Sequence, residues 1–338
     1  MEFSSNFLRI VSMVIMFMLP CRIKAAGNIS AVLAFGDSIL DTGNNNLLLT
    51  ASKCNFAPYG MSLPTKTPSG RFGNGRVFSD VLSEKLGLKS MIPAYLSPSL
   101  KATDLATGVC FASGGSGLDD LTANVQGVIT MGKQLSNFKE YVTKLTAAVG
   151  AAEAKTVISN ALFLISSGNN DLGITYTFRL RPTYTLHAYV DKLMPLAEDL
   201  VKQLYALGAR KIGYMGVLPL GCLPGNRATV GEIFCNEFLN SGSQYFNSKL
   251  QTVLTKVGKT LTDADVFYID VYNPLLDVIN NFMTQGFTNP GIGCCCIGIA
   301  PCPKVETHVF WDVAHPTEKT YKIMMETIVP KYAAHFSS

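Results

Sequence analysis

Charged residues, histidine and tryptophan are all scarce in this chain. Of its 338 residues, 15% are charged, four are histidine and one is tryptophan, whereas 48% are hydrophobic and 29 are glycine. This composition excludes a coiled coil or a highly charged disordered chain and favours a compact enzyme with a sizeable core. The four histidines also confine any chemistry that needs an imidazole base to four positions.

A hydrophobic run long enough to cross a bilayer is also missing. The apolar stretch at 10–19 is shorter than the roughly 20 residues that a membrane span requires. It follows the basic Arg9 and precedes a pair of alanines, an order typical of a secretory signal peptide. We therefore expect residues 1–26 to be cleaved and residues 27–338 to form one domain without a transmembrane segment. The rival interpretation is a retained anchor.

Neither sign of charge dominates the sequence. The net charge is +4, and losing Arg9, Arg22, Lys24 and Glu2 with the segment 1–26 leaves 25 basic and 23 acidic residues, or +2. This balance gives no reason to expect nucleic acid or an anionic membrane surface as a partner.

The cysteines lack the spacing of a zinc site. Cysteines 294–296 and Cys302 form no C-x-x-C pair, and no histidine stands at zinc-finger spacing, so we expect no metal. Eight cysteines remain once Cys21 leaves with the signal, and in a secreted chain they predict disulfides. Cys222 and Cys235 are a candidate loop-closing pair, and the other pairings stay open.

Short apolar segments alternate with helical patterns along the chain. The apolar segments are continuous rather than alternating, as expected for strands that helices cover on both faces. This pattern predicts a three-layer α/β/α domain with a mainly parallel sheet. The stretch 55–75, rich in proline and glycine, is predicted to be a long loop. The expected strands are 31–35, 109–112, 161–166, 211–217 and 266–269, and the expected helices are 77–86, 131–148, 189–207, 236–261, 274–282 and 317–330.

Polar turns follow several of the predicted strands. Ligands of an open α/β sheet bind beyond the carboxyl ends of its strands, where the turns with Ser38, Gly114–Gly115 and Asn170 fall. Ser38 is a candidate nucleophile for acyl transfer, which also needs a base and oxyanion donors. Of the four histidines, His315 alone follows an aspartate, Asp312, by three residues in a turn that leads into a helix.

Each of these residues also has an ordinary explanation. A serine after a strand is usually a turn residue or helix cap, and an Asp-x-x-His pair is more often a surface pair than a catalytic dyad. Asn170 fits a turn equally well, and Gly114–Gly115 a bend. Their joint order and their shared location at strand ends favour the catalytic interpretation.

Four blocks of the sequence resemble those of the plant GDSL esterase/lipase family, within the SGNH hydrolase superfamily. They cover nearly all of the expected mature chain, and together they are far more specific than a single Gly-Asp-Ser. The blocks are FGDSILDTGNN at 35–45, GVCFASGGSG at 108–117, GNND at 168–171 and DVAHP at 312–316.

The resemblance implies a flavodoxin-like α/β/α fold and hydrolysis of ester bonds without a cofactor. It implies Ser38, Asp312 and His315 as the catalytic triad, and Ser38, Gly115 and Asn170 as donors to the oxyanion, with Gly114 as the neighbouring possibility. It also accounts for an absence, since the G-x-S-x-G motif of α/β-hydrolases occurs nowhere in the chain.

One residue departs from the family pattern. Cys110 stands where the second block usually has an asparagine that helps to hold the loops around the oxyanion hole. A thiol is a weak donor and has no amide carbonyl. We therefore expect either that the oxyanion glycine is less well placed or that the Cys110 side chain is tied up in another interaction.

The leading hypothesis is a secreted serine hydrolase that cleaves small-molecule or lipid esters through an acyl-enzyme. One alternative is a deacetylase or acyltransferase that acts on cell-wall polysaccharide or acylated metabolites. Another is a non-catalytic extracellular coat protein that keeps the fold, for which Cys110 is the only support. The resemblance implies a plant source and an extracellular location such as cell wall or pollen coat. Asn28, in an N-x-S sequon, is the candidate N-glycosylation site.

Overall fold

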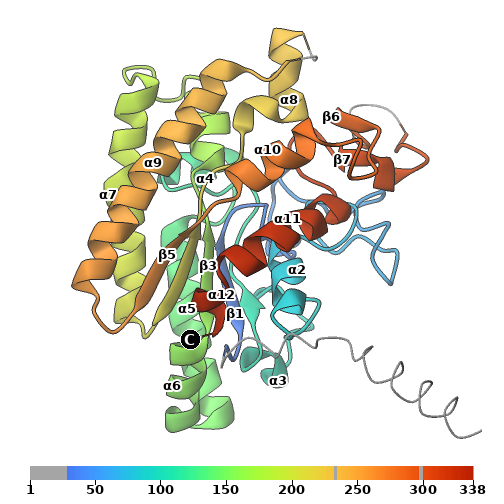
Figure 1. The fold of residues 1–338 in the computed structure, drawn as a ribbon. Helices are drawn as coiled ribbons and strands as arrows, with labels where there is room; N and C mark the ends of the chain where they lie inside the picture. Colours follow the sequence, from blue (N-terminus) through green and yellow to red (C-terminus); the bar gives the residue numbers. More distant parts are fainter. Residues whose placement is uncertain (1–28, 232–233, 297–299, 338) are drawn as a thin grey trace, which may run out of the picture.

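The computed structural model describes residues 29–231, 234–296 and 300–337 (Figure 1). The expected signal segment, 1–26, and the sequon residue Asn28 lie outside the described residues. Among the helices that are described, none has both the length and the apolar character that a membrane crossing requires.

A five-stranded sheet lies at the centre of the fold, and all of its strands are parallel. The strand order β2-β1-β3-β4-β5 is the order of flavodoxin-like folds, so the predicted fold class is confirmed. Strands β1, β3, β4 and β5 end in register at one edge, where Gly36, Ser166, Met215 and Ile269 pair in turn. The strands are β1 (Val32–Gly36), β2 (Val109–Cys110), β3 (Leu162–Ser166), β4 (Lys211–Met215) and β5 (Asp265–Ile269).

Helices cover both faces of this sheet. In Figure 1, α7 and α9 lie side by side on one side of the molecule, while α2, α10 and α11 lie on the other. Strands β1, β3 and β4 are buried along their whole length, which explains their uninterrupted apolar sequence. The helices that correspond to predicted ones are α2 (Phe78–Lys85), α5 (Met131–Val149), α7 (Leu186–Ala206), α9 (Glu237–Thr260), α10 (Tyr272–Asn280) and α11 (Glu318–Lys331).

Aromatic rings fill the space between the sheet and α5. Phe35 of β1 stacks on Phe111 at 4.9 Å between ring centroids, and Phe138 of α5 meets both Phe35 and Phe163 edge-on at 5.6 and 5.4 Å. Such buried offset and edge-to-face pairs add directional contacts to the burial of apolar area. They fix β1 within the core, so the turn that follows β1 starts from a rigid strand.

Several short elements were not predicted. Helix α6 follows α5 after Gly150, and a second, two-stranded parallel sheet joins β6 to β7. The stretch 55–75 has neither helix nor strand, as predicted. The unpredicted elements are α3 (Ala102–Leu105), α4 (Asp120–Gln126), α6 (Ala151–Asn160), the π-helix η1 (Asp171–Tyr176), η2 (Leu220–Cys222), α8 (Pro224–Arg227), η3 (Ala228–Val230), β6 (Asn289–Gly293), η4 (Val305–Thr307), β7 (His308–Phe310) and α12 (Ala333–Ser337).

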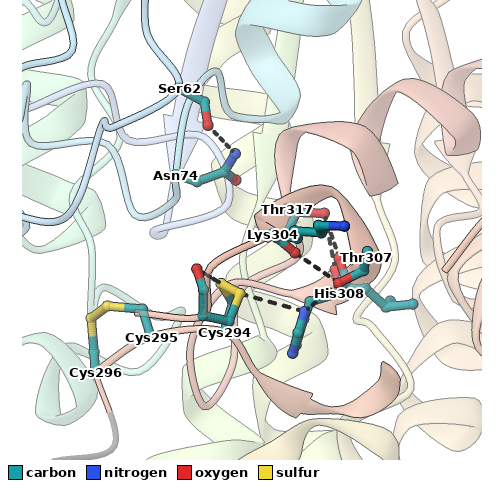
Figure 2. The surroundings of a disulfide bond; sticks show 11 residues. Ser62, Asn74, Cys294, Cys295, Cys296, Lys304, Thr307, His308 and Thr317 are labelled. Atoms are coloured by element: carbon teal, nitrogen blue, oxygen red, sulfur yellow. Dashed lines mark hydrogen bonds between the residues drawn. A yellow bond between two sulfur atoms is a disulfide. The ribbon is translucent and has the colours of Figure 1, made fainter. Parts of the chain in front are cut away.

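Six of the eight cysteines predicted to form disulfides do so, and the candidate pair Cys222–Cys235 is among them, whereas the prediction is wrong for Cys54 and Cys110. The others described are Cys294–Cys302 and the adjacent pair Cys295–Cys296, both near β6 (Figure 2). His308 Nδ1 lies 3.5 Å from the sulfur of Cys302. Cys294, Cys302 and His308 have ligand atoms close enough together to hold a metal ion, but the two sulfurs are bonded to each other. Cys54 and Cys110 are free and buried.

Candidate active site

Three side chains from opposite ends of the chain form a continuous hydrogen-bonded row. The Oγ atom of Ser38 lies 2.8 Å from Nε2 of His315, and Nδ1 of His315 lies 2.8 Å from both carboxylate oxygens of Asp312. Ser38 and Asp312 are buried, and His315 is partly buried. The residues expected as nucleophile, base and acid are therefore within hydrogen-bond reach of one another.

Ser38 lies in a tight turn at the carboxyl end of β1. Gly36 begins the turn with φ of +121°, and a Cβ there would lie 1.8 Å from the carbonyl oxygen of Ser166 on the neighbouring strand. Only glycine fits both the conformation and this close approach. The backbone N–H of Asp37 then donates to the same carbonyl oxygen at 2.9 Å, which continues the sheet for one more residue before Ser38.

Buried side chains hold this turn from two sides. The Asp37 carboxylate accepts hydrogen bonds from Ser166 Oγ and Asn169 Nδ2, both at 2.9 Å. Burial raises the pKa of Asp37 to about 6, against the lowering effect of these two bonds. On the other side, Gln134 of α5 bonds both the N–H and the carbonyl of Gly36. Sequence reasoning missed Gln134, since nothing in a helical pattern marks one polar residue as buried.

The loop with Asp312 and His315 is fixed mainly by backbone contacts. The Asp312 carboxylate accepts the backbone N–H of His315 at 2.8 Å, and the N–H of Trp311 donates to the His315 carbonyl at 2.7 Å. Cys295 in turn donates its N–H to the Trp311 carbonyl at 2.7 Å. The segment that contains the Cys295–Cys296 disulfide therefore supports the loop directly. Gly293 allows this approach, because a Cβ there would lie 2.5 Å from the Asp312 carbonyl oxygen.

Tyr59 also contacts the carboxylate of Asp312, and sequence reasoning missed it. Its hydroxyl donates to Asp312 Oδ2 at 2.9 Å, and its ring packs edge-on against Trp311 at 5.9 Å. Burial and the neighbouring Asp312 charge raise the pKa of Tyr59 far above its usual range, so the hydroxyl stays protonated and donates. Tyr59 belongs to the predicted long loop, where no local pattern indicates a contact 253 residues away.

The electrostatics of the site favour an ionised acid beside a basic imidazole. Burial alone would lower the pKa of His315, but the charge of Asp312 and their hydrogen bond outweigh it and raise that pKa above its ordinary value. Burial likewise acts to raise the pKa of Asp312, and the attraction to His315 with the backbone N–H bonds brings that pKa below its ordinary value. Asp312 therefore remains a carboxylate while His315 takes up a proton.

The expected oxyanion donors lie beside Ser38. Gly115 has φ of +91° and lines the same cavity as Ser38 and Asn170. Within the described part of the chain, neither the Ser38 nor the Gly115 backbone N–H donates to another group. One N–H of the Asn170 amide donates to the Ser116 carbonyl at 2.9 Å, which orients the side chain and leaves its second N–H available.

The loop that carries Gly115 is held by the first sequence block. Asp41 accepts the N–H of Gly114 at 2.8 Å, Asn45 donates to the Gly114 carbonyl at 2.7 Å, and Asn44 donates to the carbonyls of Cys110 and Ala112. The loop is thus tied down without an asparagine at position 110.

Cys110 itself is engaged elsewhere, which is one of the two outcomes expected for it. Its sulfur is buried and donates to the Leu40 carbonyl at 3.2 Å. Burial raises the pKa of the Cys110 thiol to about 12, so it remains neutral. The thiol acts as a small buried side chain between the first two blocks.

A cavity of about 290 Å³ opens at Ser38 and His315. One part of its wall is polar, with the Asn170 amide and the Gly115 backbone, and most of the rest is apolar. The apolar lining consists of Ile39, Phe72, Ile174, Leu218, Leu220, Leu223, Val313 and Ala314.

The other three histidines have different surroundings, and none of them contacts Ser38 in the described residues. His187 packs on Tyr245, His308 lies near Cys302, and His335 bonds Asp265 while it stacks on Phe267. The selection of His315 from the four histidines therefore agrees with the geometry.

Comparison with known families shows which family the chain belongs to. A model of the GDSL-like lipase/acylhydrolase family matches residues 32–328. The chain belongs to this family. The match spans all four GDSL sequence blocks, and the protein is an ester hydrolase of the GDSL type.

Several GDSL esterase/lipases of Arabidopsis thaliana are similar over nearly the whole chain. GDSL esterase/lipase At1g73610 is 52% identical over 90% of this chain and 88% of its own, and GDSL esterase/lipase At5g63170 is 46% identical over 96% and 98%. Among solved structures, LAE5, an alpha/beta hydrolase enzyme from the metagenome of Lake Arreo, covers 93% of this GDSL chain and 98% of its own, with a TM-score of 0.44 and 12% identity.

Proposed function

We propose that this protein is a secreted serine hydrolase that cleaves carboxylic esters, of acyl or lipid type, through a covalent acyl-enzyme. The observation that carries the proposal is the row from Ser38 through His315 to Asp312, which ends at a cavity shared with Gly115 and Asn170. A nucleophile, a base held by a third group, and donors beside the nucleophile are the parts that acyl transfer requires.

In the first half of the reaction, Ser38 Oγ attacks the ester carbonyl carbon while His315 Nε2 accepts the hydroxyl proton. Asp312 keeps the second imidazole N–H on Nδ1 and stabilises the imidazolium that forms. The carbonyl oxygen becomes an oxyanion, which the N–H groups of Ser38 and Gly115 and the free N–H of Asn170 bind. The intermediate collapses, the proton on Nε2 passes to the alcohol oxygen, and the alcohol leaves.

In the second half, water replaces the alcohol. His315 Nε2 takes a proton from the water as its oxygen attacks the acyl carbon, and the same donors bind the second oxyanion. When this intermediate collapses, the carboxylic acid leaves and Ser38 Oγ regains its proton from His315. No step calls for a metal or another cofactor.

Secretion is part of the proposal and has two supports. Residues 1–26 have the pattern of a signal peptide. The described residues contain the disulfides Cys222–Cys235 and Cys294–Cys302, which are characteristic of proteins from oxidising compartments.

The test is hydrolysis of a p-nitrophenyl ester series, from acetate to palmitate, by the mature protein and its Ser38→Ala variant. We expect turnover by the mature protein and none above background in the variant, because no other group supplies the nucleophile. Ser136→Ala, at an exposed position on α5, is the matched control and should keep full activity. Turnover that survives Ser38→Ala would overturn the mechanism.

A further inference from the structure

A second cavity adjoins the one that contains Ser38. It has a volume of about 290 Å³, and Asn226 lines both cavities. The π-helix η1 separates them, since Ile174 faces the first cavity and Tyr176 the second. The expected oxyanion residue Asn170 directly precedes η1, and Tyr176 at the end of η1 lines the second cavity. The short helix η1 therefore connects the expected oxyanion donor to the wall of the second cavity.

Three aromatic rings form part of the wall of this second cavity. Tyr176, Tyr184 and Phe238 line it. The rings of Tyr176 and Phe238 lie 6.3 Å apart, and both tyrosines pack around Tyr189. Phe238 is 58% exposed, so its ring is accessible to a ligand. Exposed aromatic rings grouped around a cavity are typical of a surface that receives a flat apolar ligand.

Among the described residues that line this cavity, arginines supply positive charge and none is acidic. Arg181 is already neutralised, because its guanidinium makes two hydrogen bonds to Asp119 at 2.8 and 2.9 Å. The charge of Arg179 is not neutralised in this way. Among the described arginines, Arg179 alone makes no ion pair or side-chain hydrogen bond. The uncompensated charge of the cavity is therefore that of Arg179.

The backbone of Arg179 adds an independent indication. Its φ is +53°, in the left-handed region, at the end of the turn that follows η1. Glycine is the usual residue at such a position, because any other side chain is crowded there by its own backbone. A strained residue whose side chain lines a cavity is a candidate for a binding role.

We propose that this second cavity is a subsite for the alcohol part of the ester, and that it prefers an aromatic alcohol with a carboxylate. The rings of Tyr176, Tyr184 and Phe238 receive the flat body of the alcohol, and Arg179 binds its carboxylate. The inference rests on the proposed ester hydrolysis at Ser38, and it names the substrate class of that site.

The contrast between the two cavities assigns one end of the ester to each. The apolar lining of the first cavity is mostly aliphatic, with Phe72 as its one aromatic ring among the described residues, so an alkyl chain gains burial there and a charge would lose hydration. The second offers ring faces and a guanidinium, which an alkyl chain leaves unused. The acyl group thus belongs in the first cavity and the alcohol in the second, with Asn226 between them.

The experiment compares pairs of butyrate esters that differ only in a carboxylate on the alcohol. One pair is phenyl and 4-carboxyphenyl butyrate, and the other is the 4-vinylphenyl ester and its 2-carboxyvinyl counterpart, whose carboxylate lies farther from the ester oxygen. For Arg179→Gln we expect kcat/KM to fall by about three- to tenfold on a carboxylated ester and to change less than twofold on its neutral partner. Because the contact is exposed, the difference should shrink at high salt.

Lys66→Gln is the matched control. Lys66 is exposed, has φ of +52°, makes no ion pair with another described residue and does not line either cavity, so removing its charge should leave both rates unchanged. Phe238→Ala tests the ring wall, and it should raise KM for both aryl esters while KM for methyl butyrate stays the same.

The failure of the subsite and the failure of the proposed function give different results. If wild type and Arg179→Gln process charged and neutral esters in the same ratio, the subsite is wrong and the hydrolase stands. If no ester is turned over, the hydrolase proposal fails, and the subsite is then tested by titrating 4-hydroxybenzoate into the wild-type protein, followed by NMR. Binding that Arg179→Gln weakens supports the subsite, and no binding, or binding that Arg179→Gln does not change, overturns it.

Discussion

Ser38 and His315 are in contact, but the segments that hold them differ in kind. Ser38 follows a buried strand, and its turn is fixed by side chains of neighbouring elements, Gln134, Ser166 and Asn169. His315 lies in a loop outside the main sheet. This loop is held by a backbone hydrogen bond from Cys295, which is part of a disulfide, and by the hydroxyl of Tyr59. The sheet therefore fixes the position of Ser38, which we call the nucleophile end of the site. Long-range loop contacts fix the position of His315, which we call the base end.

The largest effect short of losing Ser38 is expected at the base end. Asp312→Asn should lower kcat by up to roughly 10⁴, because the amide can donate to Nδ1 of His315 and so favours the wrong tautomer. Steady-state hydrolysis of the best p-nitrophenyl ester measures it. Asp277→Asn, at an exposed position of α10, serves as the control. A loss of less than tenfold would show that the acid of the triad lies elsewhere.

At the nucleophile end, Asn170→Ala should lower kcat by about 10²–10³ through the loss of one oxyanion donor. KM should change little, because the donor binds charge that develops only in the transition state. Single-turnover kinetics separate the chemical step from product release. Asn281→Ala, exposed after α10, provides the comparison. If kcat is untouched, the assignment of Asn170 is wrong.

Tyr59→Phe sharpens the contrast, since it removes one hydrogen bond from the base end and leaves the sheet unchanged. We expect kcat to fall by about tenfold, the order of a hydrogen bond to a charged group. With one donor fewer, the Asp312 carboxylate attracts a proton on His315 more strongly, so the acid limb of the pH–rate profile should move to higher pH. A purely structural role for Tyr59 would lower the rate without moving this limb.

The smallest expected effect is a shift in pH dependence. His315 must be neutral to accept the Ser38 proton, and its pKa is raised above the ordinary value of about 6.5 by Asp312 against the effect of burial. The value of kcat/KM should therefore fall with decreasing pH through a midpoint above 6.5. In Asp312→Asn the residual activity should have its midpoint at lower pH. An unchanged midpoint would contradict the proposed pair.

The same division explains what could be predicted from the sequence. The strands β1, β3 and β4 were predicted because they are continuous apolar runs, and the turn at Ser38 follows from β1. Strand β6 was missed because it contains Pro290 and two glycines and is defined by its partner β7. Helix α6 was missed as a separate element, since it follows α5 after a single glycine.

At the candidate site, sequence order and residue type were enough to propose Ser38, His315 and Asp312, which hydrogen bonds connect in the folded protein. Tyr59 was beyond reach, because its contact with Asp312 depends on how a long irregular loop folds. The second cavity was also beyond reach, since Tyr176, Arg179 and Phe238 share no pattern along the chain and meet only in the folded protein.

Ser38 and His315 are 277 residues apart in the chain. During synthesis the serine is therefore made early and stays without its base until nearly the whole protein has been translated. Under the proposed mechanism, a chain that ends before residue 312 contains Ser38 and lacks both Asp312 and His315, so we expect it to be inert toward esters. Ester-cleaving activity is therefore expected only in chains that extend past His315.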